Sequence, residues 1–92
     1  MSDTSIPFWH TQTTTDTAEL AQRDPVVVLP LAAIEQHGPH LPLSTDLDIG
    51  LGVLAEACRR LPTGVPVSVL PPQTSGSSRE HTQFPGTLSL DP

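Results

Sequence analysis

The chain has few of the residues on which several classes of protein depend. Its single cysteine, Cys58, excludes an intramolecular disulfide and a cysteine-based zinc site. Ten acidic residues outnumber four basic ones, and the formal net charge of −6 argues against nucleic acid or an anionic membrane as a partner. No apolar run approaches the roughly 18 residues that span a bilayer, and residues 1–9 lack the pattern of a secretory signal. We therefore expect a cytoplasmic protein.

Large side chains are also scarce, because aromatic residues make up only 3% of the 92-residue sequence. A chain of this length lies near the lower limit for a self-sufficient hydrophobic core. Eleven prolines and six glycines add many constraints on the backbone. We expect one small domain, at most, whose modest core would gain from a complementing chain or from assembly as a homo-oligomer.

The N-terminal part of the chain is the least informative. Residues 1–15 are polar and rich in threonine, and we interpret them as an arm that is frayed unless its apolar patch at residues 6–9 docks on a neighbouring surface. Residues 16–23 are predicted to form a short helix whose N-cap is Thr15 or Asp16.

A strand, a helix and a second strand are predicted over the middle of the chain. Residues 26–34 are apolar throughout, which is typical of a parallel strand buried on both faces, and Pro30 is expected to interrupt its hydrogen-bonded ladder. Residues 46–61 have helical periodicity, and residues 65–70 form the second apolar run. This order indicates a βαβ unit and an α/β fold class.

The predicted helix has a clear apolar stripe, which consists of Leu47, Leu51, Leu54 and Cys58. Ser44, Thr45 or Asp46 is expected to cap its start. Gly50 and Gly52 lower its helix propensity and indicate close packing against the sheet.

The C-terminal part consists of a long polar loop, residues 73–85, and the start of an extended segment, residues 86–90. Asp91 and Pro92 have the signature of the first residues of another helix. Two strands and one long helix would leave two unpaired sheet edges. We therefore expect residues 16–92 to be the N-terminal part of a larger α/β domain.

Candidate metal ligands gather directly after the first predicted strand. Glu35 and His37 follow that strand, and Asp46 opens the helix after a turn that contains two prolines and a glycine. Residues two apart in an extended segment point to the same side, and ligands bind at the carboxyl ends of strands in open α/β sheets. Carboxylate and imidazole suit zinc, manganese or a similar divalent ion. We predict that these three residues bind metal.

Two stretches of the sequence match a known pattern over most of residues 26–92. They are LPLAAIEQHGPHLPLSTD, at residues 29–46, and SSREHTQFPGTLSL, at residues 77–90. Both resemble the creatininase family of metal-dependent amidohydrolases. The resemblance implies a three-layer α/β/α creatininase-like fold with a mostly parallel sheet, of which this chain has the first βαβ unit and the following loop and strand.

The resemblance also implies a site for two divalent metal ions, zinc or manganese, with iron as a further option. Carried over by position, Glu35 binds one ion, His37 binds the other, and Asp46 bridges both. We expect His40 and His81 to support the metal ligands or to line the substrate pocket. The remaining metal ligands and the catalytic residues of the family have no counterpart in this chain.

Two functions follow from this comparison. The first is the N-terminal part of a metal-dependent amidohydrolase that hydrolyses C–N bonds of small or cyclic amides; it carries half of a dinuclear site and is inactive alone. The second is a small non-catalytic metal-binding or assembly module derived from such an enzyme.

Overall fold

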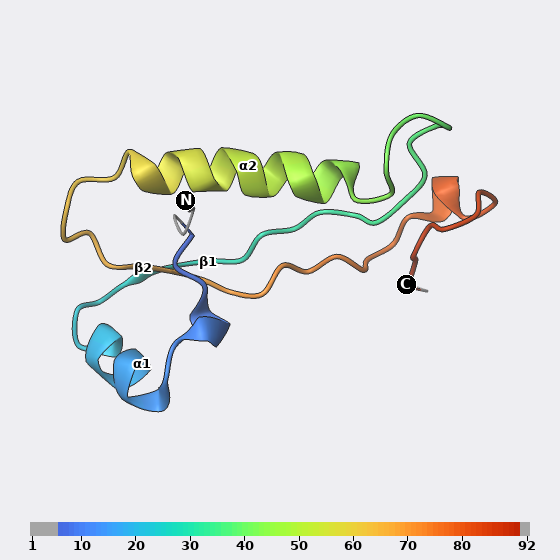
Figure 1. Ribbon diagram of the computed structural model, residues 1–92. Coiled ribbons are helices and arrows are strands. Elements are labelled where there is room, and N and C mark those ends of the chain that lie inside the picture. The colour runs from blue at the N-terminus through green and yellow to red at the C-terminus, as the bar shows by residue number, and fades with distance from the viewer. Residues whose placement is uncertain (1–5, 91–92) are drawn as a thin grey trace.

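The structure is a computed structural model that describes residues 6–90. Its elements, in chain order, are the 3₁₀-helix η1 (Trp9–Thr11), α1 (Thr14–Ala21), β1 (Val26–Val28), α2 (Thr45–Arg59), β2 (Val67–Val69) and the 3₁₀-helix η2 (Arg79–His81). α2 runs along one side of the two strands, and the segments that follow β1 and β2 extend in the same direction toward η2 (Figure 1). No helix in the described part is long and apolar enough to cross a membrane.

The predicted strand–helix–strand unit is confirmed. β1 and β2 pair in parallel, with Val26 opposite Val67 and Val28 opposite Val69, and α2 lies between them in sequence. A parallel pair needs such a crossover because the chain must return to the same end of the sheet. The structure therefore has the architecture of an α/β unit.

The first strand is shorter than predicted, because the ladder stops before Pro30. That residue has no N–H to donate, and Pro71 and Pro72 leave the opposite strand without donors at the same level. Pairing then resumes at an isolated bridge between Leu31 and Gln73. The Gln73 N–H donates to the Pro30 carbonyl at 2.9 Å, so the two segments stay together beyond the break.

The described part of the N-terminal arm docks on the sheet instead of fraying. The Val69 N–H donates to the Pro7 carbonyl at 2.9 Å, and Phe8 forms a parallel bridge with Val69. The buried Ser68 hydroxyl donates to the Gln12 side chain at 3.3 Å. Residues 6–12 thus cover the edge of β2 that faces away from β1.

α1 begins two residues earlier than predicted, and the expected N-cap is wrong. Thr13 is the N-cap, and its hydroxyl accepts from the Asp16 N–H at 3.0 Å. The Asp16 carboxylate accepts from the Thr13 N–H at 3.1 Å, which completes a capping box. Asp16 therefore supports the cap from the third helical position.

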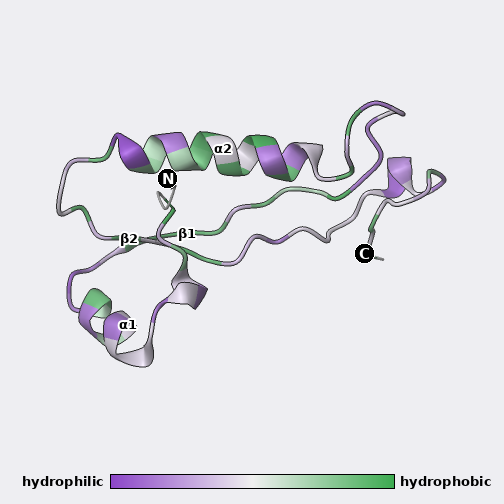
Figure 2. Cartoon of the chain, viewed as in Figure 1, coloured by the Kyte–Doolittle hydropathy of each residue, from purple (hydrophilic) through white to green (hydrophobic). Residues whose placement is uncertain are grey.

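α2 confirms the predicted long helix, with Ser44 at the N-cap position. Its apolar and polar residues alternate around the helix, as Figure 2 shows in green and purple. The expected close packing at Gly50 and Gly52 is wrong, because a Cβ added at either position would meet no heavy atom within 4 Å. These glycines lie on a part of the helix that the described residues leave open.

Burial is concentrated in β2 and not in β1. Val69 and Ser68 are fully buried, whereas Val26 is 58% exposed and Val27 is 47% exposed. The prediction of a first strand buried on both faces is therefore wrong for the described residues. Residues 6–12 cover β2 on its outer edge, but among residues 6–90 no strand pairs with the outer edge of β1.

This difference in burial predicts that the same substitution lowers the free energy of unfolding by different amounts in the two strands. Val69→Ala removes two buried methyl groups and is expected to lower the free energy of unfolding by about 1–3 kcal/mol. Val26→Ala is the matched control in the adjacent strand and is expected to cost much less, since its side chain already contacts water. Urea denaturation followed by circular dichroism measures both, and equal losses would contradict this description of the core.

Asp91 and Pro92, read as the start of a further helix, lie outside the described residues, as do residues 1–5 of the arm.

Candidate metal centre

The backbone of Glu35 is held between two loops at the end of the first extended segment. Its N–H donates to the Leu43 carbonyl at 3.2 Å. On either side of it, Ile34 accepts from the Leu88 N–H at 2.9 Å, and the Gln36 N–H donates to the Thr87 hydroxyl at 3.0 Å. These contacts join residues 34–36 to a segment about fifty positions later in the chain.

The turn from His37 to α2 is fixed by local contacts. Gly38 has a φ of 75°, a left-handed conformation that suits glycine. The Pro42 carbonyl accepts from both the N–H and the hydroxyl of Thr45, at 3.1 and 2.5 Å, and α2 starts at that residue. Asp46 is therefore placed in the first turn of α2 and faces back toward His37.

A second glycine ties this turn to the C-terminal loop. Gly86 has a φ of 93°, and a Cβ built on it would lie 2.6 Å from Cδ1 of Leu43. A Cβ at position 86 would make the flexible Leu43 side chain move, and the positive φ is what requires a glycine there.

The structure brings Glu35, His37 and Asp46 together, as their spacing predicts. Each offers a ligand atom within 4.8 Å of the ligand atoms of the other two. His37 Nε2 lies 3.2 Å from the Asp46 carboxylate. The Glu35 side chain is 13% exposed, that of His37 23% and that of Asp46 44%, so the group opens to solvent on the helix side. The donor set, two carboxylates and an imidazole, fits a zinc or manganese ion.

The pKa of His37 is raised above its ordinary value of 6.5. The largest cause is the contact of Nδ1 with the Glu35 backbone carbonyl at 3.2 Å, which favours the protonated ring. Partial desolvation acts in the opposite direction, and the charge and hydrogen bond of Asp46 add to the increase. Both ring nitrogens therefore face acceptors, and a metal ion that binds at Nε2 competes with a proton there.

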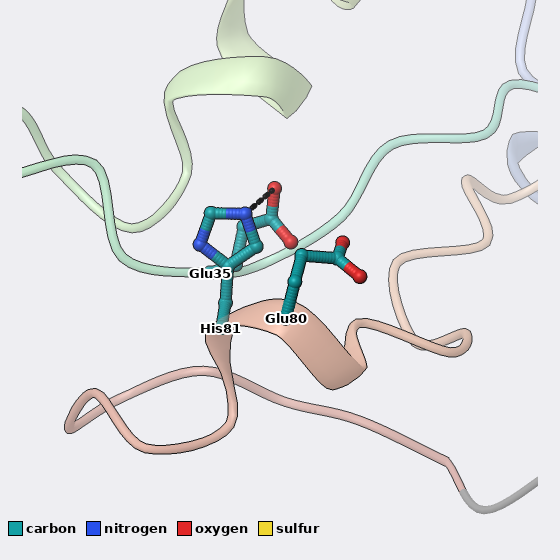
Figure 3. Close-up of side chains that lie close together, drawn as sticks. All are labelled: Glu35, Glu80 and His81. Atoms are coloured by element: carbon teal, nitrogen blue, oxygen red, sulfur yellow. Dashed lines mark ion pairs between the residues drawn. The ribbon is translucent and has the colours of Figure 1, made fainter.

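Glu35 also takes part in a second cluster, with Glu80 and His81 (Figure 3). Both come from η2, and His81 Nε2 lies 3.6 Å from the Glu35 carboxylate. The predicted site included His81 but not Glu80. The sequence signal for Glu80 was its position next to His81 in the loop that the family resemblance covers, but nothing in that loop showed that it would reach Glu35.

His40 is the predicted residue that the structure leaves outside both clusters. It is exposed at the tip of the turn after Gly38, and among the described residues it belongs to neither group of candidate ligands. Its role as a supporting or pocket residue stays a prediction.

The contact between Asp46 and His37 predicts how a substitution of Asp46 changes the pKa of His37 in the metal-free protein. Asp46→Asn removes a charge and weakens a hydrogen bond, so we expect the pKa of His37 to fall but to stay above 6.5, because the larger contribution of the Glu35 carbonyl remains. NMR titration of the imidazole protons measures the pKa, and His37→Gln identifies the resonance. An unchanged pKa in Asp46→Asn would contradict the observed geometry.

The raised pKa also sets the sign of a stability change in the metal-free protein. Protonated His37 contributes stability that is fully present below the ordinary pKa of 6.5 and is lost as the pH rises through the higher folded-state pKa.

Residues 10–92 match the model of the Creatininase family, described as creatinine amidohydrolase. The mycofactocin precursor peptide peptidase of Mycolicibacterium smegmatis is 39% identical over 79 residues, which cover 84% of this chain and 32% of the relative. The peptidase of the same name from Mycobacterium ulcerans is 40% identical over 82 residues, 84% of this chain and 33% of the relative. The creatinine amidohydrolase of Pseudomonas putida is 33% identical over 79 residues, 80% of this chain and 29% of the relative.

The chain thus spans about a third of the length of the curated relatives that it matches. No solved structure matches it significantly. Because the family model covers residues 10–92, the chain belongs to the creatininase family.

Proposed function

We propose that this chain supplies part of the dinuclear metal site of a metal-dependent amidohydrolase with a three-layer α/β/α fold. The observation that carries the proposal is the approach of the ligand atoms of Glu35, His37 and Asp46 to within 4.8 Å of one another, between the extended segment after β1 and the start of α2. Membership of the creatininase family supports the reaction class.

The three ligands have different roles in this proposal. Glu35 binds one ion and His37 binds the other. Asp46 bridges the two ions, which its two carboxylate oxygens and its half-exposed position at the start of α2 permit. Each ion then has two protein ligands among these three residues, whereas a catalytic zinc ion usually has about three. Additional donors, from other residues of the same protein or from another chain, are needed to complete the site.

When bound, a pair of divalent ions polarises a carbonyl group and lowers the pKa of water near it, which suits hydrolysis of an amide C–N bond. One relative is named for a peptide and another for creatinine, a cyclic amide, so we propose an amide or peptide substrate for the whole protein. Of the residues described here, Glu35, His37 and Asp46 hold the site, and none is assigned to proton transfer.

A metal-binding module without catalysis is the second candidate. Such a module needs fewer ligands, since two donors and solvent hold an ion without fixing the geometry that turnover requires. Both candidates predict metal binding, and they differ only in hydrolysis.

Zinc titration against a chromophoric chelator tests the proposed ligands. Asp46→Asn is expected to weaken zinc binding by at least about tenfold, the scale at which even groups outside the ligand shell affect affinity. Asp48→Asn is the matched control two positions later in the same helix, because its carboxylate accepts from the Ser44 hydroxyl and belongs to neither cluster. It is expected to change the affinity by less than about twofold.

The titration tests the ligand assignment, and a hydrolysis assay then decides between the two candidates. Equal effects of Asp46→Asn and Asp48→Asn would reject the ligand assignment. If the assignment holds, creatinine is incubated with the zinc-loaded chain and its hydrolysis is followed. We expect no turnover by the 92-residue chain alone, and turnover restored by a polypeptide that supplies the missing ligands would support the amidohydrolase over the module.

A further inference from the structure

Gln36 lies between Glu35 and His37 in the sequence, and its side chain contacts Gly38 and His81. Its side-chain oxygen accepts from the Gly38 N–H at 2.9 Å. Its side-chain nitrogen lies 3.1 Å from His81 Nδ1. The other ring nitrogen of His81, Nε2, lies 3.6 Å from the Glu35 carboxylate. A chain of polar contacts therefore runs from a backbone N–H through Gln36 and His81 to Glu35.

The direction of hydrogen-bond donation along these contacts is set by the Gly38 N–H. A backbone N–H can only donate, so the atom of Gln36 that faces Gly38 is the amide oxygen. The amide NH₂ group is then the part of Gln36 that faces His81, and it too can only donate. His81 Nδ1 must accept, and a neutral imidazole that accepts at Nδ1 carries its proton on Nε2. That proton faces the Glu35 carboxylate across 3.6 Å, a separation longer than a direct hydrogen bond, which a small rotation of either side chain would close.

We propose that Gln36 and His81 are positioning residues: Gln36 fixes the tautomer of His81, and the Nε2–H of His81 holds the Glu35 carboxylate in the orientation for metal binding. This inference rests on the proposed role of Glu35 as a metal ligand. Metal ligands are commonly held by such outer partners, and the loss of one typically weakens metal binding by about 10–100-fold.

The same contacts argue against His81 as a direct ligand in the second cluster. Binding of a metal ion at Nε2 needs a free lone pair there, which moves the proton to Nδ1. That proton would face the NH₂ group of Gln36. Rotating the Gln36 amide to present its oxygen would place NH₂ against the Gly38 N–H. The backbone of Gln36 is itself fixed, because its N–H donates to the Thr87 hydroxyl at 3.0 Å.

The arrangement also agrees with the view in Figure 3. The imidazole of His81 lies against the Glu35 carboxylate, to which the dashed line joins it, while Glu80 extends beside them from the same 3₁₀-helix. Glu80 is exposed, whereas the side chains of Glu35 and His81 are 13% and 28% exposed. The pair that makes the contact is thus the sheltered part of the cluster.

The tautomer is tested first, on the metal-free protein at about pH 9, far above the ordinary imidazole range. Long-range ¹H–¹⁵N NMR spectra distinguish a protonated ring nitrogen from an unprotonated one. We expect His81 to be protonated at Nε2 in the wild type. Gln36→Glu replaces the NH₂ donor with a carboxylate oxygen of the same shape, and we expect it to move the proton to Nδ1. A wild-type ring protonated at Nδ1 would overturn the proposal.

Zinc affinity then separates a positioning role from direct ligation. His81→Gln retains an N–H donor that can reach Glu35 but has no imidazole, and His81→Leu retains neither. We expect His81→Leu to weaken zinc binding by about tenfold or more and His81→Gln to restore most of that loss. If both variants lose affinity equally, or if zinc shifts the ¹⁵N resonance of His81 Nε2 as direct coordination does, His81 is a ligand and the proposal is wrong. Circular dichroism of each variant identifies a change of fold, and a misfolded variant is replaced by His81→Asn or His81→Val.

This pair of measurements keeps the two proposals apart. If the wild type fails to bind zinc through Glu35 and Asp46, the proposed function fails, but the tautomer of His81 in the metal-free protein is still measured. If zinc binds as proposed and the tautomer is the opposite one, only the positioning role fails.

Discussion

The candidate centre depends on the way in which pairing between two extended segments continues beyond the short β-ladder. β1 and β2 pair over three residues each, and prolines then remove donors from both segments. Gln73 restores the pairing by bonding to Pro30 and Ala32, and Leu88 bonds to Ile34 further on. Without these contacts Glu35 would have no fixed position, because it lies seven residues after the end of the ladder.

The parts of the structure that could be predicted are those that neighbouring residues determine. The βαβ order follows from two apolar runs and a helical stripe between prolines and glycines. The approach of Glu35, His37 and Asp46 follows from a spacing of two in extended backbone and from a turn limited by Gly38 and two prolines. Both features are local in the sequence, so the sequence alone was enough to expect the approach of the three residues, whereas the contacts that hold Glu35 in place are long-range.

The parts that could not be predicted depend on residues far apart in the chain. β2 is buried where residues 6–12 dock on its outer edge, and an apolar strand has the same sequence pattern whether or not such a segment covers it. Glu80 lies close to Glu35 because the loop that carries it is held there by the contacts of Thr87 with Gln36 and of Leu88 with Ile34. The predicted N-cap of α1 was wrong for a different reason. An aspartate suits both the N-cap and the third helical position, and Asp16 occupies the third.

Because Gly86 lies next to the Leu43 side chain, the residues that can occupy these two loop positions depend on each other. A larger residue at position 86 would carry two separate costs: a small one to displace the flexible Leu43 side chain, and a larger one for a positive φ that side chains disfavour. A smaller residue at position 43 would relieve the first cost and leave the second. Substitutions at these two positions are therefore coupled in one direction only. A smaller residue at position 43 is compatible with Gly86, but a smaller residue at position 43 does not make a replacement of Gly86 acceptable.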